Sequence, residues 1–309
     1  MTDQQPLYHH YLPAFYQARW CGEDGRLRRF SKPYQDKFVA KWVSPEVSGG
    51  EDYLYSDKTA PTASEHAMES RFMSPLDSLA SQALSALEAS DPAMRHDPRL
   101  RSAWSRFLIS LMMRMPDHLE TLTQGLIEEW ARTMPEIGIA YEAQKGPTDP
   151  ATLGEYLDTL PPDEVRGWML GVLRILINRA RVGEWINNMR WFIRTIEGPS
   201  EFLTSDRPII SQYDVGTEGS YILLPIGPKR VFIAVNSLAT QRQFENYDPE
   251  EWVQALNRMI AGAAVKFVFA KDDNKFAFVK EQFGIEPRET LFDKLVRYRQ
   301  QKNANPDAL

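Results

Sequence analysis

The stretch Glu201-Phe-Leu-Thr-Ser-Asp206-Arg-Pro208-Ile-Ile210 decides how the second half of this chain is organised. Apolar residues lead into a short polar segment, and Pro208 and β-branched residues follow, which predicts a strand, a sharp turn and a second strand. A turn held between two strands fixes a side chain while leaving it reachable, so Asp206 is a candidate functional carboxylate. The alternative is that Asp206 only caps its own turn, as Ser and Asp do before a proline.

On both sides of this stretch, runs rich in aromatic and β-branched residues alternate with turn signals. We therefore expect strands at 189–196, 202–205, 221–225, 231–235, 265–270 and 276–279. A helix at 249–261 interrupts this series, and a helix at 289–300 follows it. Near the other end of the chain, Gly22-Glu-Asp-Gly25 precedes two β-like pieces at 27–30 and 38–43, which predicts a small hairpin.

The spacing of apolar residues predicts that the middle of the chain is helical. Thr62-Ala-Ser-Glu65 has the spacing of a capping box, so a helix should begin there, carry Glu65, His66 and Glu69, and end or kink at Pro75. His66 and Glu69, three positions apart, could share a metal or a proton, and the alternative for His66 is a solvated helical face. Apolar residues recur every three or four positions over 98–115, which predicts a helix that packs along one side. Further helices are expected after Pro116, at 151–160 and at 162–182, where Gly183 permits a break.

These elements predict an α+β fold, with a helical middle layer packed on a mostly antiparallel C-terminal sheet and a small N-terminal hairpin. We expect one domain over 1–309, made of a β-rich segment at 1–60, a helical layer at 61–183, a sheet-rich part at 184–302 and a tail at 303–309.

Composition narrows the class of protein. The chain has 43% apolar and 25% charged residues, which is typical of a globular protein and excludes disordered and fibrous classes. Its apolar runs are far shorter than the roughly 20 residues that span a bilayer, and its first residues lack the features of a signal peptide. The single cysteine, Cys21, cannot form an internal disulfide. We expect a cytoplasmic protein whose net charge of −6 argues against coating nucleic acid or an anionic membrane.

One segment departs from this acidic average. Between 165 and 196 the chain has no lysine, a single acid, Glu184, and six arginines, namely Arg166, Arg174, Arg179, Arg181, Arg190 and Arg194. Arginine suits bidentate binding of carboxylate or phosphate groups. Arg174 and Arg181 are seven positions apart and should project together from one helix toward a phosphate-bearing or acidic ligand. The alternative is that the arginines pair with the acidic segments at 117–142 and 155–164.

The strong catalytic signatures are absent from the sequence. It has no glycine-rich nucleotide loop, no His-Glu-x-x-His pair, no nucleophile elbow and no four-cysteine zinc spacing. His9 and His10 are adjacent, and adjacent strand residues point to opposite faces, so only one of them can serve a given site. His10 is a candidate for a site role, against the alternative of a buried, hydrogen-bonded histidine.

The order of several short motifs resembles the bacterial family of unknown function DUF4238. The similarity runs from about Tyr8 to Val279 and is carried by His10-x-x-Pro13-x-x-Tyr16-x-x-x-Trp20, Glu69, Arg114-x-Pro116, Trp191, Thr204-Ser-Asp206-x-Pro208-Ile, Leu224-Pro-Ile-Gly-Pro228 and Asn236. The chain departs from the family pattern at Gln17 and Trp20, which are exchanges of the core type. The resemblance indicates which positions belong to the family motifs, but it implies no activity.

Those positions supply one imidazole, two carboxylates and one guanidinium: His10, Glu69, Asp206 and Arg114. If they converge, the first three are candidate ligands of a divalent cation such as Mg²⁺ or Mn²⁺, with His10 as ligand or general base, and Arg114 holds a phosphate. That set predicts a metal-assisted phosphodiesterase or nuclease. The alternative is a non-catalytic binding or regulatory module in which the four residues are structural and the arginine-rich face binds an acidic partner. A shared cleft favours the first hypothesis, and burial without access favours the second.

Overall fold

The structure, a computed structural model, describes residues 7–34, 37–91, 94, 97–120, 135–159, 161–212 and 218–287. Its central feature is that the Glu201–Ile210 stretch passes from one sheet to another. Strand β6 (Thr204–Ser205) ends a four-stranded antiparallel sheet with the order β3-β2-β10-β6, made with β2 (Leu27–Tyr34), β3 (Lys37–Val43) and β10 (Val268–Ala270). Strand β7 (Ile210–Gln212) ends a second one.

The second sheet has the order β5-β9-β8-β7 and is also antiparallel, with β5 (Arg190–Thr195), β8 (Tyr221–Gly227) and β9 (Arg230–Val235). A short pair of strands, β1 (Tyr8–His10) and β4 (Gly50–Asp52), forms a separate ladder. The predicted N-terminal hairpin is confirmed as β2 and β3, although its partners are strands from the far end of the chain.

Strands β8 and β9 are apolar on both faces because both faces of their sheet are covered. Side chains alternate along a strand, so Leu223 and Ile233 point to one side while Leu224 and Phe232 point to the other. The first side packs against α12 (Pro249–Ala263) and the first sheet, and the second side packs against the helical layer. The ring of Trp104 on α4 lies 5.4 Å from the ring of Phe232. The predicted packing of helices on a C-terminal sheet is thus confirmed.

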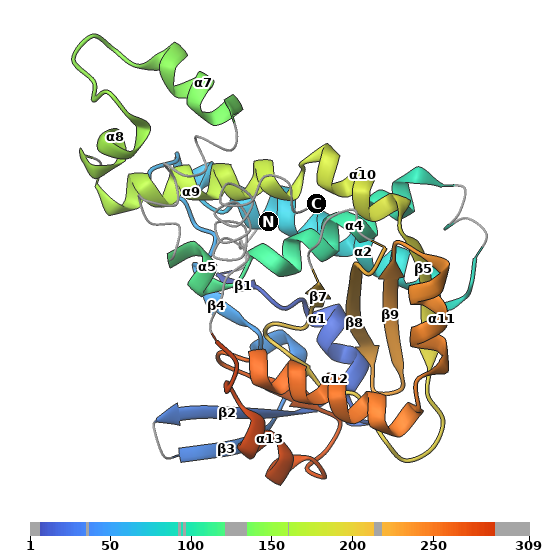
Figure 1. Cartoon of the computed structure of the whole chain (residues 1–309). Coiled ribbons are helices and arrows are strands. Elements are labelled where there is room, and N and C mark those ends of the chain that lie inside the picture. Colours follow the sequence, from blue (N-terminus) through green and yellow to red (C-terminus); the bar gives the residue numbers. More distant parts are fainter. Residues whose placement is uncertain are drawn as a thin grey trace.

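The helical layer contains α2 (Ser74–Glu88), α4 (Pro98–Met113), α5 (Pro116–Glu120), α7 (Pro135–Gln144), α8 (Leu153–Thr159), α9 (Pro162–Ile177) and α10 (Ala180–Asn188). Figure 1 shows α9 and α10 running across the upper part of the molecule, below α7, with α4 and α2 beneath them and the sheet of β8 and β9 lower still. In the described part of the chain, no helix has the length and apolar character needed to cross a bilayer.

Three boundaries differ from the sequence predictions. The chain turns at Asn178 and Arg179, so the arginine-rich segment forms two helices, and Gly183 lies inside the second. Pro75 does not end a helix, because a π-helical turn (Glu69–Met73) leads directly into α2 and places the proline in its first turn, where the missing N–H has little effect. Residues 276–279 belong to helix α13 (Phe276–Gln282) and not to a strand.

The sequence also gave no expectation for α11 (Leu238–Asn246), which follows β9 and packs against β5. The short N-terminal helix α1 (Ala14–Gln17) contacts α2, and the 3-10 turn Ala18–Trp20 that follows it contacts β8. The helix predicted at 289–300, the tail at 303–309 and most of the helix predicted after Glu120 lie outside the described residues.

Candidate functional site

The carboxylate of Asp206 is buried and fully engaged by backbone amides. Its Oδ1 accepts from the N–H of Val265 at 3.0 Å, and its Oδ2 accepts from those of Lys266 and of Phe267, the latter at 3.0 Å. The N–H of Asp206 donates in turn to the carbonyl of Phe267 at 3.1 Å. Burial raises the pKa of Asp206 to about 6, against the opposing effect of the three amides. The geometry is that of a side chain that ties the turn after β6 to the segment before β10.

The rest of the Glu201–Asp206 stretch is clamped as tightly. Buried Asn257 of α12 accepts from the N–H of Leu203 at 2.7 Å and donates to the carbonyl of Glu201 at 2.8 Å. The indole of Trp20 donates to the carbonyl of Phe202 at 2.9 Å. These bonds hold the stretch from both sides. The motif Thr204-Ser-Asp206 at its end therefore has a structural role.

Glu69 and Arg114 form a second buried charged group, together with Asp77. Arg114 is at the C-terminal cap of α4 and is 0% exposed, and its Nη1 donates to both carboxylate oxygens of Asp77 at 3.0 and 3.1 Å. Among the described residues, its Nε and Nη2 have no hydrogen-bond partner, and neither does the buried Oε2 of Glu69. We name Glu69, Asp77 and Arg114 the charged cluster.

Burial and the neighbouring charges shift the pKa values of both acids of the charged cluster. Burial raises the pKa of Glu69 to about 7, the nearby charge of Asp77 adds to this, and Arg114 opposes it. Burial also raises the pKa of Asp77, again against the effect of Arg114. The like charge that acts on Glu69 is therefore that of Asp77.

Tyr55 connects the charged cluster to a pair of buried histidines. Its hydroxyl donates to the carbonyl of Arg114 at 2.8 Å, and its N–H donates to Nδ1 of His9 at 2.8 Å. The ring of His9 stacks on Tyr55 and meets the ring of His66 edge-on at 5.5 Å. Nδ1 of His66 is 2.9 Å from Oγ of Ser56. His66 is buried, so the solvated helical face predicted for it is wrong.

His10 lies on the other face of β1 from His9, as the alternation of strand side chains requires. It is half-buried, and its Nε2 is 3.1 Å from the carbonyl of Pro45, which takes up the ring N–H. Burial lowers the pKa of His10, and the positive charge of Arg114 lowers it further, against the effect of the Pro45 carbonyl. A neutral, hydrogen-bonded imidazole is the form that this environment favours.

The four predicted residues therefore fall into two groups. Arg114 interacts electrostatically with both His10 and Glu69, whereas Asp206 is bound by the backbone before β10. Among the described residues, no group of three or more His, Cys, Asp or Glu side chains is placed so that it could hold a metal ion. The predicted ligand set of His10, Glu69 and Asp206 is not among such groups in the described residues, so a shared metal site stays a prediction.

Arg174 and Arg181 do not share a helix. Arg174 is in the last turn of α9, Arg181 is in the first turn of α10, and the chain bends between them. The wheel argument that placed them side by side is wrong for this reason. Both are exposed, and within the described ranges neither forms a salt bridge with an acidic side chain. The predicted pairing with acidic helices is not observed for these two.

Sequence reasoning missed Asp77 and Tyr55. Asp77 lies eight positions after Glu69, and it reaches the neighbourhood of Glu69 through a π-helical turn that no local pattern indicates. Tyr55 lies in a loop after β4 without any motif around it. These residues are identified only by their tertiary contacts, the ion pair of Asp77 with Arg114 and the hydrogen bond of Tyr55 to the carbonyl of Arg114.

The fold and these groups define an α+β protein whose two buried charged regions tie helices and strands together. The model of the family described as "Protein of unknown function (DUF4238)" matches residues 8–274, and the chain belongs to this family. The comparison with curated proteins found no match, and neither did the comparison with solved structures.

Proposed function

We propose that this protein is a non-catalytic binding or regulatory module that uses an arginine face to bind an acidic partner. The arginine face consists of Arg174, Arg179 and Arg181, at the junction of α9 and α10. Arg174 and Arg181 are exposed and Arg179 is half-buried. The observation that carries the proposal is that, in the described part of the chain, none of the three has an acidic side chain as a partner.

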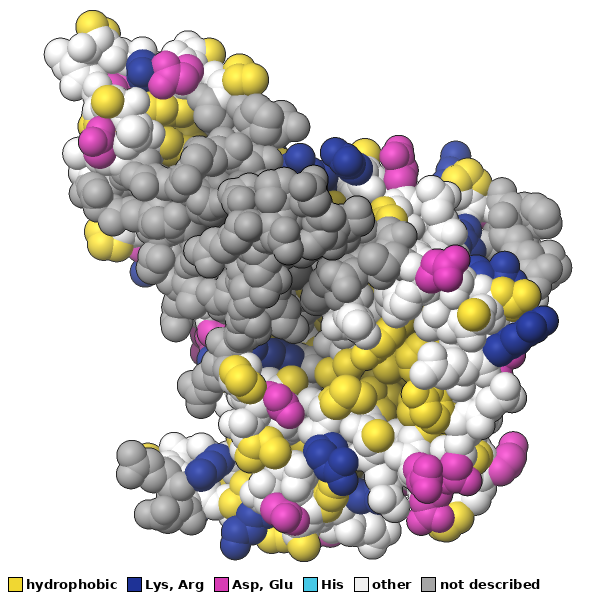
Figure 2. Space-filling view, in the orientation of Figure 1, with side chains coloured by type: hydrophobic (Ala, Val, Ile, Leu, Met, Phe, Trp, Pro, Cys, Tyr) yellow, Lys and Arg dark blue, Asp and Glu magenta, His cyan; other side chains and the backbone are white. Residues whose placement is uncertain are grey.

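The other arginines of the same segment serve as a contrast. Arg166 donates to the carbonyl of Leu54 at 2.6 Å, and Arg194 donates to the carbonyls of Phe244 and Tyr247. These side chains hold the fold, whereas no member of the arginine face forms an ion pair within the described ranges. We infer that its donors serve an outside acceptor. Figure 2 shows Lys and Arg side chains at the upper edge of the molecule, where Figure 1 places α10.

The chemistry of guanidinium groups favours a carboxylate-rich or phosphate-bearing partner. Each planar group can bind such an acceptor through two parallel hydrogen bonds, and it loses hydration more readily than an ammonium. Because the whole chain carries a net charge of −6, the arginine face is a local positive region that orients an acidic partner as it approaches.

The burial of the predicted catalytic residues supports the same proposal. Arg114, Asp206 and Glu69 are 0%, 1% and 8% exposed. Groups with so little access are poorly placed to touch a substrate, and Asp206 in particular already accepts three hydrogen bonds.

Binding of fluorescein-labelled polyglutamate tests the proposal, with anisotropy as the readout. We expect salt-sensitive binding to the wild type and a loss of at least about tenfold when Arg174, Arg179 and Arg181 are all changed to Gln. The matched control changes Lys32, Lys37 and Lys41 to Gln, which removes the same charge from the exposed surface of β2 and β3. Equal losses in both variants would show a general charge effect and would refute the arginine face. Competition by inorganic polyphosphate distinguishes a phosphate-bearing ligand from a carboxylate-rich one.

A second candidate function, phosphoester hydrolysis, is favoured by the charged cluster. A buried guanidinium with two unpartnered nitrogens could hold an anion, and a carboxyl group with a pKa of about 7 is suited to general acid–base chemistry near neutral pH. In this candidate Arg114 binds the phosphate, Glu69 transfers the proton and His10 assists. Hydrolysis of bis(p-nitrophenyl) phosphate that is lost in Glu69→Gln would support it, and an inactive wild type would remove it.

We also propose a cytoplasmic location. Cys21 is the only cysteine of the chain, which is the usage expected in a reducing compartment.

A further inference from the structure

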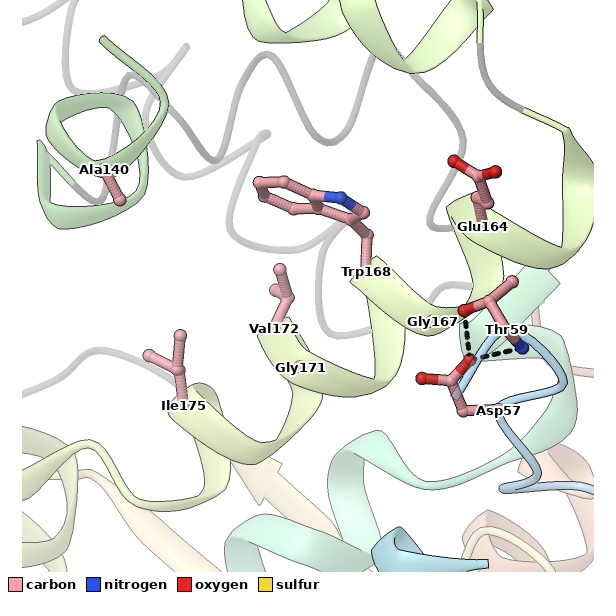
Figure 3. A pocket seen from close by; sticks show the side chains of 9 residues that line it. All are labelled: Asp57, Thr59, Ala140, Glu164, Gly167, Trp168, Gly171, Val172 and Ile175. Carbon is pink, nitrogen blue, oxygen red and sulfur yellow. Dashed lines mark hydrogen bonds between the residues drawn. The ribbon is translucent and has the colours of Figure 1, made fainter. Parts of the chain in front are cut away.

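A pocket of about 630 Å³ opens beside helix α9, on a part of the molecule that neither candidate function uses. This volume is within the range of small-molecule sites. We name it the Trp168 pocket. As Figure 3 shows, the indole of Trp168 projects from α9, with the carboxylates of Asp57 and Glu164 on one side of it and Val172 and Ile175 on the other.

The acidic end of the Trp168 pocket is built by close packing of a loop on the helix. Oδ1 of Asp57 accepts from the N–H and the hydroxyl of Thr59, at 3.0 and 2.6 Å, so the loop fixes this carboxylate. A Cβ atom at Gly167 would lie 2.9 Å from Oδ1 and 3.0 Å from Oδ2 of Asp57. Only glycine allows the helix to approach the carboxylate so closely. Glu164, one turn earlier on α9, is exposed and adds a second negative charge.

The opposite end of the Trp168 pocket is apolar. Val172 and Ile175 continue the same face of α9, and Ile175 is 50% exposed. Gly171 presents no side chain here, and no described atom lies within 4 Å of where its Cβ atom would be. Within the described residues, the half-buried indole of Trp168 thus lies between an anionic end and an aliphatic end of the pocket.

We propose that the Trp168 pocket binds an organic cation, an ammonium group attached to an apolar body. Among the described residues, the lining has two carboxylates and no lysine or arginine, a charge that favours cations over anions. The face of an indole is the best aromatic partner for an ammonium group, and the cation–π attraction between them becomes stronger as the ammonium loses water. The body of the ligand then lies along Val172 and Ile175, where apolar area is buried. This assignment is independent of the arginine face, which prefers ligands of the opposite charge.

Calorimetric titration of the whole chain with benzyltrimethylammonium tests the proposal. Benzylsulfonate, with the opposite charge, and benzyl alcohol, with none, serve as comparison ligands. We expect binding of the cation, weaker binding of the alcohol and none of the sulfonate. Trp168→Leu should weaken cation binding about tenfold or more, and Glu164→Gln should weaken it by a smaller factor of about three to ten.

Two matched variants control for indirect effects. Trp42→Leu removes another partly exposed indole, on β3, and Glu184→Gln removes an exposed acid on α10. Both should bind the cation as the wild type does, and circular dichroism should show that all four variants are folded. The proposal is overturned if the wild type does not bind the cation, if benzylsulfonate binds equally well, or if folded Trp168→Leu retains wild-type affinity.

Discussion

The turn at Asp206 and the charged cluster both bury carboxylates, yet they satisfy the buried charge to different degrees. Asp206 accepts from three backbone N–H groups and needs no counter-charge within hydrogen-bond reach. In the charged cluster, Nη1 of Arg114 donates to both oxygens of Asp77, while its Nε and Nη2 and one oxygen of Glu69 lack partners in the part of the chain that the structure describes. A buried charge with all its hydrogen bonds made stabilises one fold. A buried charge that lacks them lowers the free energy of unfolding, and binding of a proton or a ligand can offset this loss.

The largest effect is expected from removing the cation of the charged cluster. Arg114→Met should lower the free energy of unfolding by about 3–5 kcal/mol, because it leaves the buried carboxyl groups of Asp77 and Glu69 without an opposite charge. Urea denaturation measures this change.

A double variant provides the control for that prediction. Asp77→Asn combined with Arg114→Met removes both members of the ion pair, so it should recover part of the lost stability. A loss below about 1 kcal/mol in the single variant would contradict the view that Arg114 neutralises buried acids.

The charged cluster should also make stability depend on pH near neutrality. The folded-state pKa of Glu69 is raised to about 7 from an ordinary value of 4.5, so the folded protein binds a proton that the unfolded chain has already released. This contribution to stability is fully present below about pH 4.5 and is lost as the pH rises through 7, and it amounts to at most about 3 kcal/mol.

Glu69→Gln isolates this contribution. Because the amide does not titrate, the variant should lose less stability than the wild type between about pH 5 and 8, in urea denaturation at several pH values. Parallel profiles for the two proteins would show that Glu69 is already ionised in the folded state throughout this range.

A moderate effect is expected at the turn. Asp206→Asn should destabilise the protein by about 1–3 kcal/mol at neutral pH, because an amide offers one acceptor oxygen where three N–H groups require two. Asn257→Ala, which removes the side chain that clamps the same stretch from α12, is a suitable comparison and should have a loss of similar size. A stabilised Asp206→Asn variant would instead indicate that the charge is repelled by its surroundings.

The sequence predicts the type of an element well where one hydrophobic pattern continues over the whole element. β8 and β9 were predictable because a strand covered on both faces is a continuous apolar run. Residues 276–279 are wrongly predicted as a strand because the run Phe276-Ala-Phe-Val279 by itself is compatible with one. Phe276, Val279 and Phe283 have helical spacing, Val279 is buried, and the rings of Phe276 and Phe283 lie 5.3 and 5.8 Å from that of Phe38.

The sequence predicts the candidate site less well, because charges pair through tertiary contacts. Family motifs brought Glu69, Arg114 and Asp206 to attention, but they could not show that Arg114 bonds Asp77 or that Asp206 is held by the backbone. The bend at Asn178 is equally hidden, since Asn and Arg are compatible with a helix and tertiary packing decides where the axis changes direction.

The smallest effect is expected from divalent cations, and it tests whether the two regions are one site. A metal held jointly by Glu69 and Asp206 would bind only the folded state, and it would stabilise that state by about 2.7 kcal/mol at a hundredfold excess over its dissociation constant. We expect Mg²⁺ and Mn²⁺ to leave the melting temperature unchanged, because the two carboxylates belong to separate groups and Asp206 already has its donors. An increase that Asp206→Asn abolishes and Asn257→Ala preserves would join the two regions into one metal site and would restore the phosphodiesterase hypothesis. An increase that survives in Asp206→Asn but disappears in Glu69→Gln would place the cation at the charged cluster alone, where a proton would compete with it near pH 7.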